Sequence, residues 1–330
     1  MRIAFAGTPA FAVPSLRALL DSEHDVVCVI TQPDRPAGRG LSLRSPPVKE
    51  FAEAAGLKVY QPAKFNKREF LDELEGLALD LIITAAYGRI FKARSLGLPS
   101  KGCVNLHASL LPRYRGVAPI NWAVINGETE TGVTTFFMEE GVDTGEMIVQ
   151  KGTAIGENET AGELYERLAD LGAGAIIETC GLIARGEAPR ISQDDSLASY
   201  APKLSKDDAE IAWDRPARRI HDHIRGVNPW PGAFTRLRGG TVKILESRVG
   251  PEAAPPATGT VGTASAGSTG GGSGSPEPGT ILDIHDESGI LLACGDGCVW
   301  LRRVQAAGKK PAGGAAFSRG ARLKRGECFA

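Results

Sequence analysis

Polar side chains gather in the segment NLHASLLPRYRG, which runs from residue 105 to residue 116. Asn105 and His107 alternate with Val104 and Leu106. A strand here would therefore project both polar groups from one face and apolar groups from the other. An amide and an imidazole on one face need hydrogen-bonding partners, supplied either by the fold or by a ligand. For an arbitrary Asn and His the fold is the more common source, so this pair alone leaves both interpretations open.

A carboxylate lies between two glycines in the segment GVDTGE, at residues 141–146. Glycine on both sides predicts a tight turn, because glycine adopts backbone angles that other residues avoid. Such a turn could deliver Asp143 beside the end of the strand that carries His107. This second cluster favours a functional site over a pair of internally satisfied polar residues.

An amide, an imidazole and a carboxylate, with neither a metal nor a hydroxyl nucleophile, suit acyl transfer to an amine. Asn105 can donate to a developing oxyanion, and His107 can do the same as a cation or can shuttle a proton. Asp143 can orient the imidazole and stabilise its charged form. The competing arrangement is a hydrolase triad of Ser109, His107 and Asp143. It is disfavoured because Ser109 is not in a G-x-S-x-G elbow, and because residues at i and i+2 rarely pair as nucleophile and base.

The elements that must position these residues follow a strand–helix alternation in the first half of the chain. Short apolar or β-branched runs predict strands at Arg2–Ala6, Asp25–Thr31, Leu57–Gln61, Leu79–Ala86 and Gly102–His107. Helical patterns lie between most of them, at Phe11–Leu20, Val48–Ala55 and Arg68–Leu77. This order predicts an α/β fold with a doubly wound, mostly parallel sheet, whose ligands bind beyond the carboxyl ends of the strands. The first strand ends in Gly7-Thr8-Pro9, which is not the G-x-G-x-x-G of a dinucleotide site.

The second half of the chain predicts a separate β-rich domain. Two strands (Gly132–Met138 and Gly145–Ile155) and a long helix (Ala161–Arg185) close the first domain, predicted at residues 1–188. A polar linker is expected at residues 189–207. Residues 208–330 carry short strand patterns, as in an OB-like β-barrel, at Gly232–Leu237, Thr241–Ser247, Thr280–His285, Gly289–Ala293 and Cys298–Val304. Within them, residues 251–279 are rich in Ala, Gly, Ser, Thr and Pro and predict a disordered insertion.

Charge is unevenly distributed, although 38 basic side chains nearly balance 39 acidic ones. Residues 1–200 carry a net charge of −6 and residues 201–330 one of +5. A globally basic nucleic-acid coat and an acidic tail are excluded, whereas a local basic surface is not. Residues 301–330 hold eight basic side chains, Lys309 and Lys310 among them, against the single acid Glu327. A solvated face is the usual meaning of such a run, but its place after a barrel-like pattern favours a nucleic-acid contact.

The predicted connection Gln32–Pro47 is unusually long and contains Arg35, Arg39 and Arg44 among glycines and prolines. A solvated surface loop is one interpretation. A contact to RNA is the other, because guanidinium groups suit phosphates and base edges, and glycines let a loop mould to its target.

Several motifs resemble the formyltransferases that use 10-formyltetrahydrofolate. The catalytic motifs are NLHASLLPRYRG and EEGVDTGE, whereas FAGTPAFAVPSL, TQPDRPAGRG, AAYGRI, KLSKDDAEIAW, NPWPGAF and AAGKK are similar to the methionyl-tRNA formyltransferases in particular. The resemblance implies a Rossmann-like catalytic domain that moves a formyl group from 10-formyltetrahydrofolate to the α-amino group of charged initiator methionyl-tRNA. It implies Asn105, His107 and Asp143 as the catalytic set. A folate-binding loop is implied at Ser109, Leu110, Leu111 and Pro112.

The resemblance also implies how the substrates are held. The arginine-containing loop would wedge into the acceptor end of the tRNA, with Arg39 prominent, and pterin walls are implied at Phe91 and in the region Ala85–Ile90. Together with the basic C-terminal run, this gives five expected tRNA contacts: Arg35, Arg39, Arg44, Lys309 and Lys310.

Two other functions stay open. A formyltransferase for a small amine, such as a sugar nucleotide or glycinamide ribonucleotide, would explain the catalytic cluster alone. A catalytically silent RNA-binding protein would explain only the basic regions. Six cysteines without a C-x-x-C pair, no signal peptide and no apolar run of about 18 residues predict a cytoplasmic protein without a membrane segment. No metal site is expected, and the absence of a long apolar heptad predicts a monomer.

Overall fold

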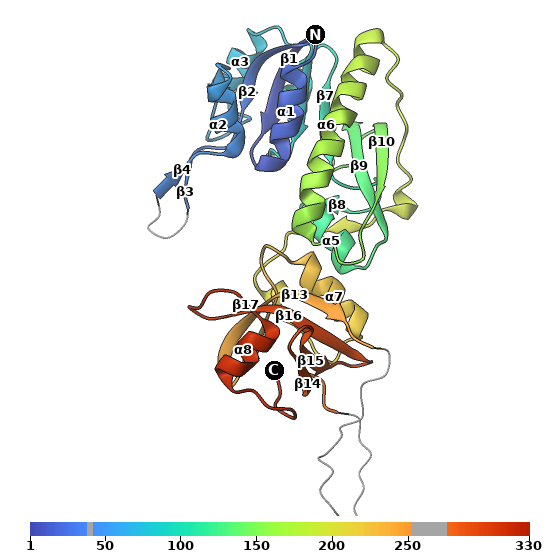
Figure 1. Cartoon of the computed structure of the whole chain (residues 1–330). Coiled ribbons are helices and arrows are strands. Elements are labelled where there is room, and N and C mark those ends of the chain that lie inside the picture. Colours follow the sequence, from blue (N-terminus) through green and yellow to red (C-terminus); the bar gives the residue numbers. More distant parts are fainter. Residues whose placement is uncertain (38–41, 252–275) are drawn as a thin grey trace, which may run out of the picture. The chain divides into compact units, whose positions relative to one another are not determined.

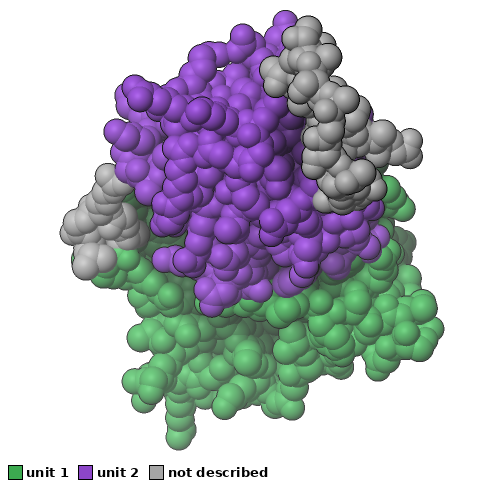
Figure 2. All heavy atoms as spheres, turned by 90° about the horizontal axis from the view of Figure 1, so that it is seen from below, with its two compact units in different colours: residues 1–120, 129–155, 163–203 green, residues 121–128, 156–162, 204–330 purple. Residues whose placement is uncertain are grey.

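The computed structural model describes residues 1–37, 42–251 and 276–330. These residues form two compact units, which Figure 2 colours separately. Unit 1 comprises Met1–Ile120, Thr129–Ile155 and Glu163–Lys203, and unit 2 comprises Asn121–Glu128, Gly156–Gly162 and Leu204–Ala330. Arg39 and most of the predicted insertion at 251–279 lie outside the described residues.

Unit 1 is built on a seven-stranded sheet with the order β10-β9-β7-β6-β1-β2-β5 (Figure 1). The parallel strands are β1 (Arg2–Gly7), β2 (Asp25–Ile30), β5 (Val59–Tyr60), β6 (Leu81–Ala85) and β7 (Cys103–His107). Strands β9 (Glu130–Phe137) and β10 (Met147–Ala154) add an antiparallel edge. The predicted doubly wound, mostly parallel sheet is confirmed. Because β1 lies between β2 and β6, the chain order reverses there, and this is where such sheets bind ligands.

Helices alternate with the strands of unit 1 as their apolar periodicity predicts. The main ones are α1 (Val13–Leu20), α2 (Pro47–Ala54), α3 (Arg68–Glu75) and α6 (Ala161–Arg185), with the shorter α4 (Ala93–Leu96) between them. Most of α5 (Pro119–Ile125) belongs to the segment Asn121–Glu128 of unit 2. All five residues of β6 are buried, as in a parallel sheet covered on both faces. None of the helices in the described ranges combines the length and the apolar character that crossing a bilayer requires.

Two segments of unit 1 are more ordered than the sequence predicted. The long loop contains a hairpin of β3 (Arg35–Ala37) and β4 (Ser42–Arg44), in which Arg35 pairs directly with Arg44. The first part of the expected linker belongs to unit 1. There, β11 (Tyr200–Ala201) pairs with β8 (Arg115–Gly116), and Ile191 forms a bridge with Met147. Both segments form short strands through backbone hydrogen bonds. Their sequences have no apolar periodicity, so the sequence analysis could not predict these strands.

Unit 2 contains an antiparallel sheet with the order β12-β13-β16-β15-β14, to which β17 (Ala312–Gly313) adds beside β16. Its strands are β12 (Phe234–Leu237), β13 (Gly240–Val249), β14 (Ile281–His285), β15 (Gly289–Ala293) and β16 (Cys298–Ala306). Helices α7 (Ala217–Gly226) and α8 (Gly314–Ala321) pack on this sheet around a core that includes Trp213, Ile220 and Phe329. The predicted barrel-like antiparallel domain is confirmed.

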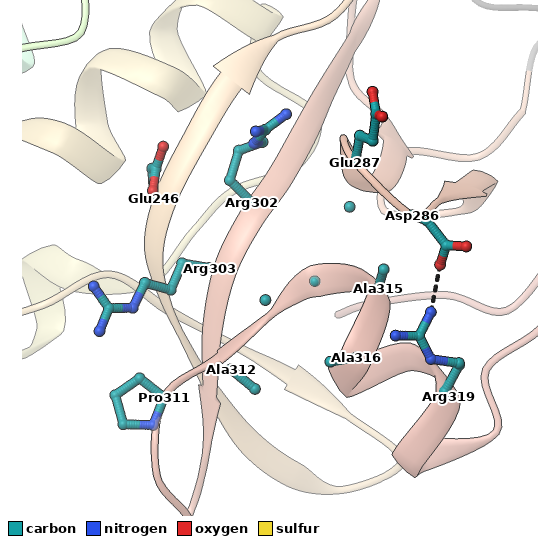
Figure 3. A pocket seen from close by; sticks show the side chains of 13 residues that line it. Glu246, Asp286, Glu287, Arg302, Arg303, Pro311, Ala312, Ala315, Ala316 and Arg319 are labelled. Atoms are coloured by element: carbon teal, nitrogen blue, oxygen red, sulfur yellow. Dashed lines mark hydrogen bonds and ion pairs between the residues drawn. The ribbon is translucent and has the colours of Figure 1, made fainter.

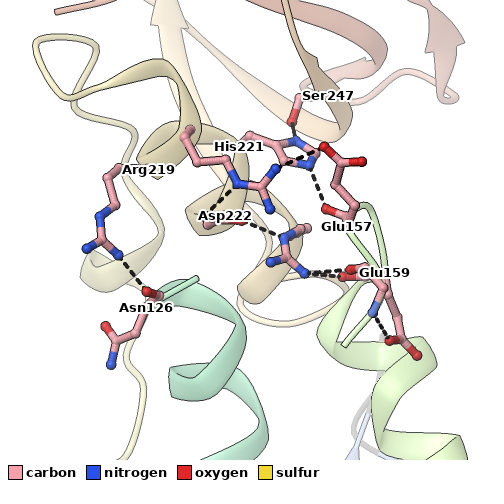
Figure 4. Close-up of polar contacts among 10 residues, drawn as sticks. Asn126, Glu157, Glu159, Arg219, His221, Asp222 and Ser247 are labelled. Carbon is pink, nitrogen blue, oxygen red and sulfur yellow. Dashed lines mark hydrogen bonds and ion pairs between the residues drawn. The ribbon is translucent and has the colours of Figure 1, made fainter. Parts of the chain in front are cut away.

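Helix α7 anchors the segment 156–162 within unit 2 (Figure 4). A buried ion pair joins Arg225 Nε to Asp222 Oδ1 at 2.8 Å, and Arg225 also donates to the carbonyls of Gly156 and Glu159. His221 is 2% exposed, and its Nδ1 lies 2.9 Å from the Ser247 hydroxyl. These contacts explain why a segment far from α7 in sequence belongs to the same unit.

The stability of unit 2 should depend on pH through His221. Burial lowers the pKa of His221 from the ordinary 6.5, so the unfolded chain takes up a proton at a higher pH than the folded one. We therefore expect unit 2 to lose stability as the pH falls below 6.5 and through the lower folded pKa. His221→Gln, which keeps one donor and one acceptor, should reduce this loss. Burial also lowers the pKa of His223, so part of the dependence should remain.

Tryptophan fluorescence can measure this effect, because all four tryptophans lie in unit 2. Thermal unfolding of the full chain is compared at about pH 7.5 and about pH 5.5, on the two sides of an ordinary histidine pKa. A smaller drop in midpoint for His221→Gln than for the unchanged chain is expected. Equal drops would show that His221 does not carry the dependence.

Candidate active site

Asn105 lies on β7 directly opposite Thr84 of β6. The buried Thr84 hydroxyl donates to Asn105 Oδ1 at 2.6 Å. This bond fixes the amide with its oxygen toward β6. Within the described residues, the amide nitrogen has no hydrogen-bond partner, so it is free to donate to a ligand at the carboxyl end of the sheet. The sequence analysis did not identify Thr84. Its only distinguishing feature in the sequence is that it is a polar residue near the end of an apolar strand.

His107 ends β7 and is 5% exposed. Its Nε2 lies 2.9 Å from the carbonyl oxygen of Tyr114. A carbonyl only accepts, so Nε2 carries the proton and donates it. Its Nδ1 faces Asp143, with 3.6 Å between Nδ1 and Oδ2. The imidazole therefore keeps Nδ1 as the nitrogen that can exchange a proton, with a carboxylate beside it.

Asp143 is held on the connection between β9 and β10 by an unusual backbone. Its φ of 55° is in the left-handed region, and its Oδ2 accepts from the backbone N–H of Gly116 at 2.8 Å. Gly145 is required two residues later, because a Cβ there would lie 1.7 Å from the carbonyl oxygen of Phe137. The turn predicted from the two glycines thus exists, and it brings Asp143 to His107.

The loop Ser109–Pro112 is fixed mainly by internal contacts. Ser109 is fully buried, and its hydroxyl donates to the carbonyl of Arg113 at 2.6 Å. This hydroxyl is therefore not positioned as a nucleophile beside His107. Leu111 is also buried, whereas Leu110 and Pro112 are partly exposed. Of the four residues expected to bind folate, these last two have side-chain surface to offer a ligand.

The region expected to surround a pterin is an aromatic cluster. Phe91 is 2% exposed and packs on Phe65, with ring centroids 4.3 Å apart, so its ring belongs to the core. The Tyr87 hydroxyl is buried and has no hydrogen-bond partner among the described residues. Burial raises the pKa of Tyr87, so this hydroxyl stays neutral and can donate. Ile90, in contrast, is 69% exposed.

The residues expected to contact RNA fall into both units. Arg35 and Arg44 are exposed on the hairpin of unit 1, and among the described residues neither pairs with a carboxylate. Lys309 and Lys310 are exposed in the turn between β16 and β17 of unit 2. Like charges directly opposite each other on a hairpin are unfavourable. The Arg35–Arg44 pair therefore favours an anionic partner.

The basic C-terminal run is partly neutralised by acids from earlier strands. Arg319 forms an ion pair with Asp286 and Arg325 with Asp283. A hollow of about 340 Å³ lies here. It is lined by Arg302, Arg303 and Arg319 together with Glu246, Asp286 and Glu287 (Figure 3). The charges of this hollow are balanced, so it is not an obvious phosphate site. Counting charges along the run alone overstates how basic this surface is.

Four buried cysteines offer no competing nucleophile. Burial raises the pKa of Cys28, Cys103, Cys180 and Cys294 to about 12, so these thiols stay protonated. Within the described ranges, no group of three or more His, Cys, Asp or Glu side chains is arranged to hold a metal ion.

Known proteins match both units of the chain. The Formyl transferase family matches residues 1–180, and the Formyl transferase, C-terminal domain family matches residues 203–322. The methionyl-tRNA formyltransferase of Geobacter sulfurreducens is 45% identical over 326 residues, covering 99% of this chain and 96% of that protein. The one from Moorella thermoacetica is 46% identical over 327 residues, covering 99% and 98%.

Solved structures share the fold at low sequence identity. WlaRD, a sugar 3N-formyl transferase crystallised with dTDP and 5-N-formyl-THF, is 20% identical with a TM-score of 0.65, covering 94% of this chain and 99% of that one. HypX from Aquifex aeolicus in complex with tetrahydrofolic acid is 18% identical with a TM-score of 0.60, covering 96% and 47%. At this identity the likeness establishes the fold, whereas the curated relatives establish the family.

Proposed function

The chain belongs to the methionyl-tRNA formyltransferase family, and from this premise we propose that Asn105, His107 and Asp143 perform its formyl transfer. The family reaction formylates the α-amino group of methionyl-tRNA with a formyl-folate. The specific donor proposed is 10-formyltetrahydrofolate, and the specific acceptor is charged initiator tRNA. The observation that carries the assignment is the amide nitrogen of Asn105, which has no partner among the described residues, beside an imidazole–carboxylate pair at the carboxyl edge of the sheet.

Asn105 would stabilise the negative charge that develops on the formyl oxygen by a hydrogen bond, and a charged His107 imidazole nearby would add its positive charge. When bound, the folate supplies the formyl carbon and the nitrogen that leaves. Asn105 Nδ2 is the available donor, because Thr84 already holds Oδ1. A preorganised donor of this kind contributes roughly 10²- to 10³-fold to turnover.

His107, assisted by Asp143, would transfer a proton from the attacking amine to the leaving nitrogen. The attacking amine must lose one proton and the leaving nitrogen must gain one. Nε2 of His107 is committed to Tyr114, so Nδ1 is the nitrogen that can move this proton. Asp143 Oδ2, 3.6 Å from Nδ1, would favour the charged imidazole. No covalent enzyme intermediate is needed, since the amine itself is the nucleophile.

The described residues fit a folate. The buried Tyr87 hydroxyl lacks a partner among them and follows β6, whose carboxyl end is next to that of β7. Leu110 and Pro112 offer partly exposed apolar surface on the neighbouring loop, consistent with a folate-binding role for Ser109–Pro112.

For the tRNA, we propose contacts to Arg35, Arg39 and Arg44 of unit 1 and to Lys309 and Lys310 of unit 2. Arg35 and Arg44 of the hairpin support this assignment, because both are exposed and neither pairs with a carboxylate among the described residues. Residues 1–188, with the part of the expected linker up to Lys203 that belongs to unit 1, would form the catalytic domain, and residues 208–330 the tRNA-binding domain. The enzyme would act as a cytoplasmic monomer.

The deciding assay follows labelled formyl from 10-formyltetrahydrofolate to acceptors. Initiator tRNA charged with methionine is the test acceptor, and charged elongator tRNA and an amino-sugar nucleotide are the controls. Label on initiator methionyl-tRNA, with little on either control, is expected. Label on the sugar nucleotide and none on tRNA would overturn the assignment in favour of a small-amine formyltransferase.

A further inference from the structure

Gln193 lies in the polar segment that follows α6, and its side chain contacts the turn of residues 141–146 that carries Asp143, the catalytic turn. Its single amide nitrogen donates to two backbone carbonyls of that turn, Asp143 O at 2.8 Å and Gly145 O at 2.8 Å. One carbonyl belongs to Asp143 itself, whose carboxylate faces His107, and the other lies two residues further along the turn. Gln193 therefore holds the backbone of the catalytic turn by two direct hydrogen bonds.

The other end of the Gln193 amide is held by Arg115. Oε1 accepts from Arg115 Nε at 3.1 Å and from Arg115 Nη2 at 2.8 Å. Arg115 is 3% exposed, so its guanidinium is a fixed anchor. The next residue, Gly116, donates its backbone N–H to Asp143 Oδ2. Arg115 thus acts on the backbone of Asp143 through the Gln193 amide, whereas Gly116 binds the Asp143 carboxylate directly.

The geometry points to Gln193 as a positioning residue that sets the distance between Asp143 and His107. The turn needs such support because Asp143 has a positive φ of 55° and lies outside the strands. Its carboxylate is 3.6 Å from Nδ1, a separation that a small shift of the turn would change. A misplacement of about 1 Å can cost roughly 10²-fold in rate. This inference rests on the proposed catalytic role of Asp143.

Gln193→Glu is the informative variant. A glutamate keeps one oxygen for the buried Arg115, so the anchor retains its partner, and its second oxygen takes the place of the amide nitrogen. It lacks the amide N–H, so the carbonyls of Asp143 and Gly145 lose their donor. We expect kcat to fall roughly 10- to 100-fold, with the KM values for tRNA and folate nearly unchanged. The defect should shrink at lower pH, where a protonated glutamate can donate again.

Asp195→Asn is the matched control. Asp195 also contacts Arg115, at 2.8 Å, but its side chain is 83% exposed and, among the described residues, makes no hydrogen bond or ion pair with the catalytic turn. Its replacement should leave kcat nearly unchanged. A loss equal to that of Gln193→Glu would show that the Arg115 ion pair, rather than the amide bridge, matters.

A double-mutant cycle with Asp143→Asn separates this inference from the proposed function. If Gln193 acts through Asp143, Gln193→Glu should cause little further loss of kcat in the Asp143→Asn background. Equal losses in both backgrounds would overturn the positioning role. Normal activity of Asp143→Asn itself would instead overturn the proposed catalytic set. Thermal unfolding of each variant checks that the fold is intact.

Discussion

Replacing Asp143 with asparagine should lower kcat by roughly 10²- to 10⁴-fold while leaving the fold intact. Asparagine tolerates the left-handed backbone that Asp143 adopts, with φ at 55°, and its side-chain oxygen can still accept from Gly116. What the variant loses is the negative charge next to His107 Nδ1. The imidazole then has no carboxylate to favour its charged form during proton transfer.

The measurement is steady-state formylation of methionyl-tRNA, with thermal unfolding of the same preparations. Asp143→Ala is a useful comparison, because alanine is strained at a positive φ and should lower stability as well as kcat. Near-normal turnover of a well-folded Asp143→Asn enzyme would remove Asp143 from the catalytic set. Loss of both turnover and stability in the asparagine variant would point to a structural role instead.

The regular elements could be predicted because burial requires a periodic pattern. The helix predicted at Ala161–Arg185 has the same bounds in the structure, and so does the strand Gly289–Ala293. In the helix, apolar residues recur at the spacing of one buried face, whereas the strand is a continuous apolar run that is buried along its whole length. Helix α8 was missed because its short sequence, GAAFSRGA, has a single large apolar side chain, so no apolar periodicity marks it. Its contacts with β15 and β16 favour the helix, and they involve residues distant in sequence.

The catalytic residues could be predicted by type, but their supports could not. Asn105 and His107 share one strand, so their common face follows from the period of two. The contact between Gly116 and Asp143 spans 27 residues, and that between Gln193 and Asp143 spans 50. Such bonds depend on where loops return to the sheet. No local pattern marks Gln193, which lies in a segment that composition alone describes as a polar linker.

Neutralising the hairpin arginines should raise the KM for tRNA roughly 10-fold or more, with little change in the KM for folate. The variant is Arg35→Gln with Arg44→Gln, which removes both charges and keeps a polar side chain. Because the two arginines lie opposite each other, their repulsion disappears in the variant, and the hairpin should be no less stable. A weaker affinity without a loss of stability therefore identifies a lost RNA contact.

Salt provides an independent measure of the same contacts. Each phosphate neutralised by an arginine releases a counterion, so the slope of log KM for tRNA against log salt should decrease by roughly two in the double variant. Arg68→Gln is the matched control, since Arg68 is an exposed arginine of α3 in the same unit, with 86% of its side chain accessible. An unchanged slope, or an equal change for Arg68→Gln, would mean that the tRNA does not contact the hairpin through these charges. Any contact between unit 1 and the tRNA would then involve residues other than Arg35 and Arg44.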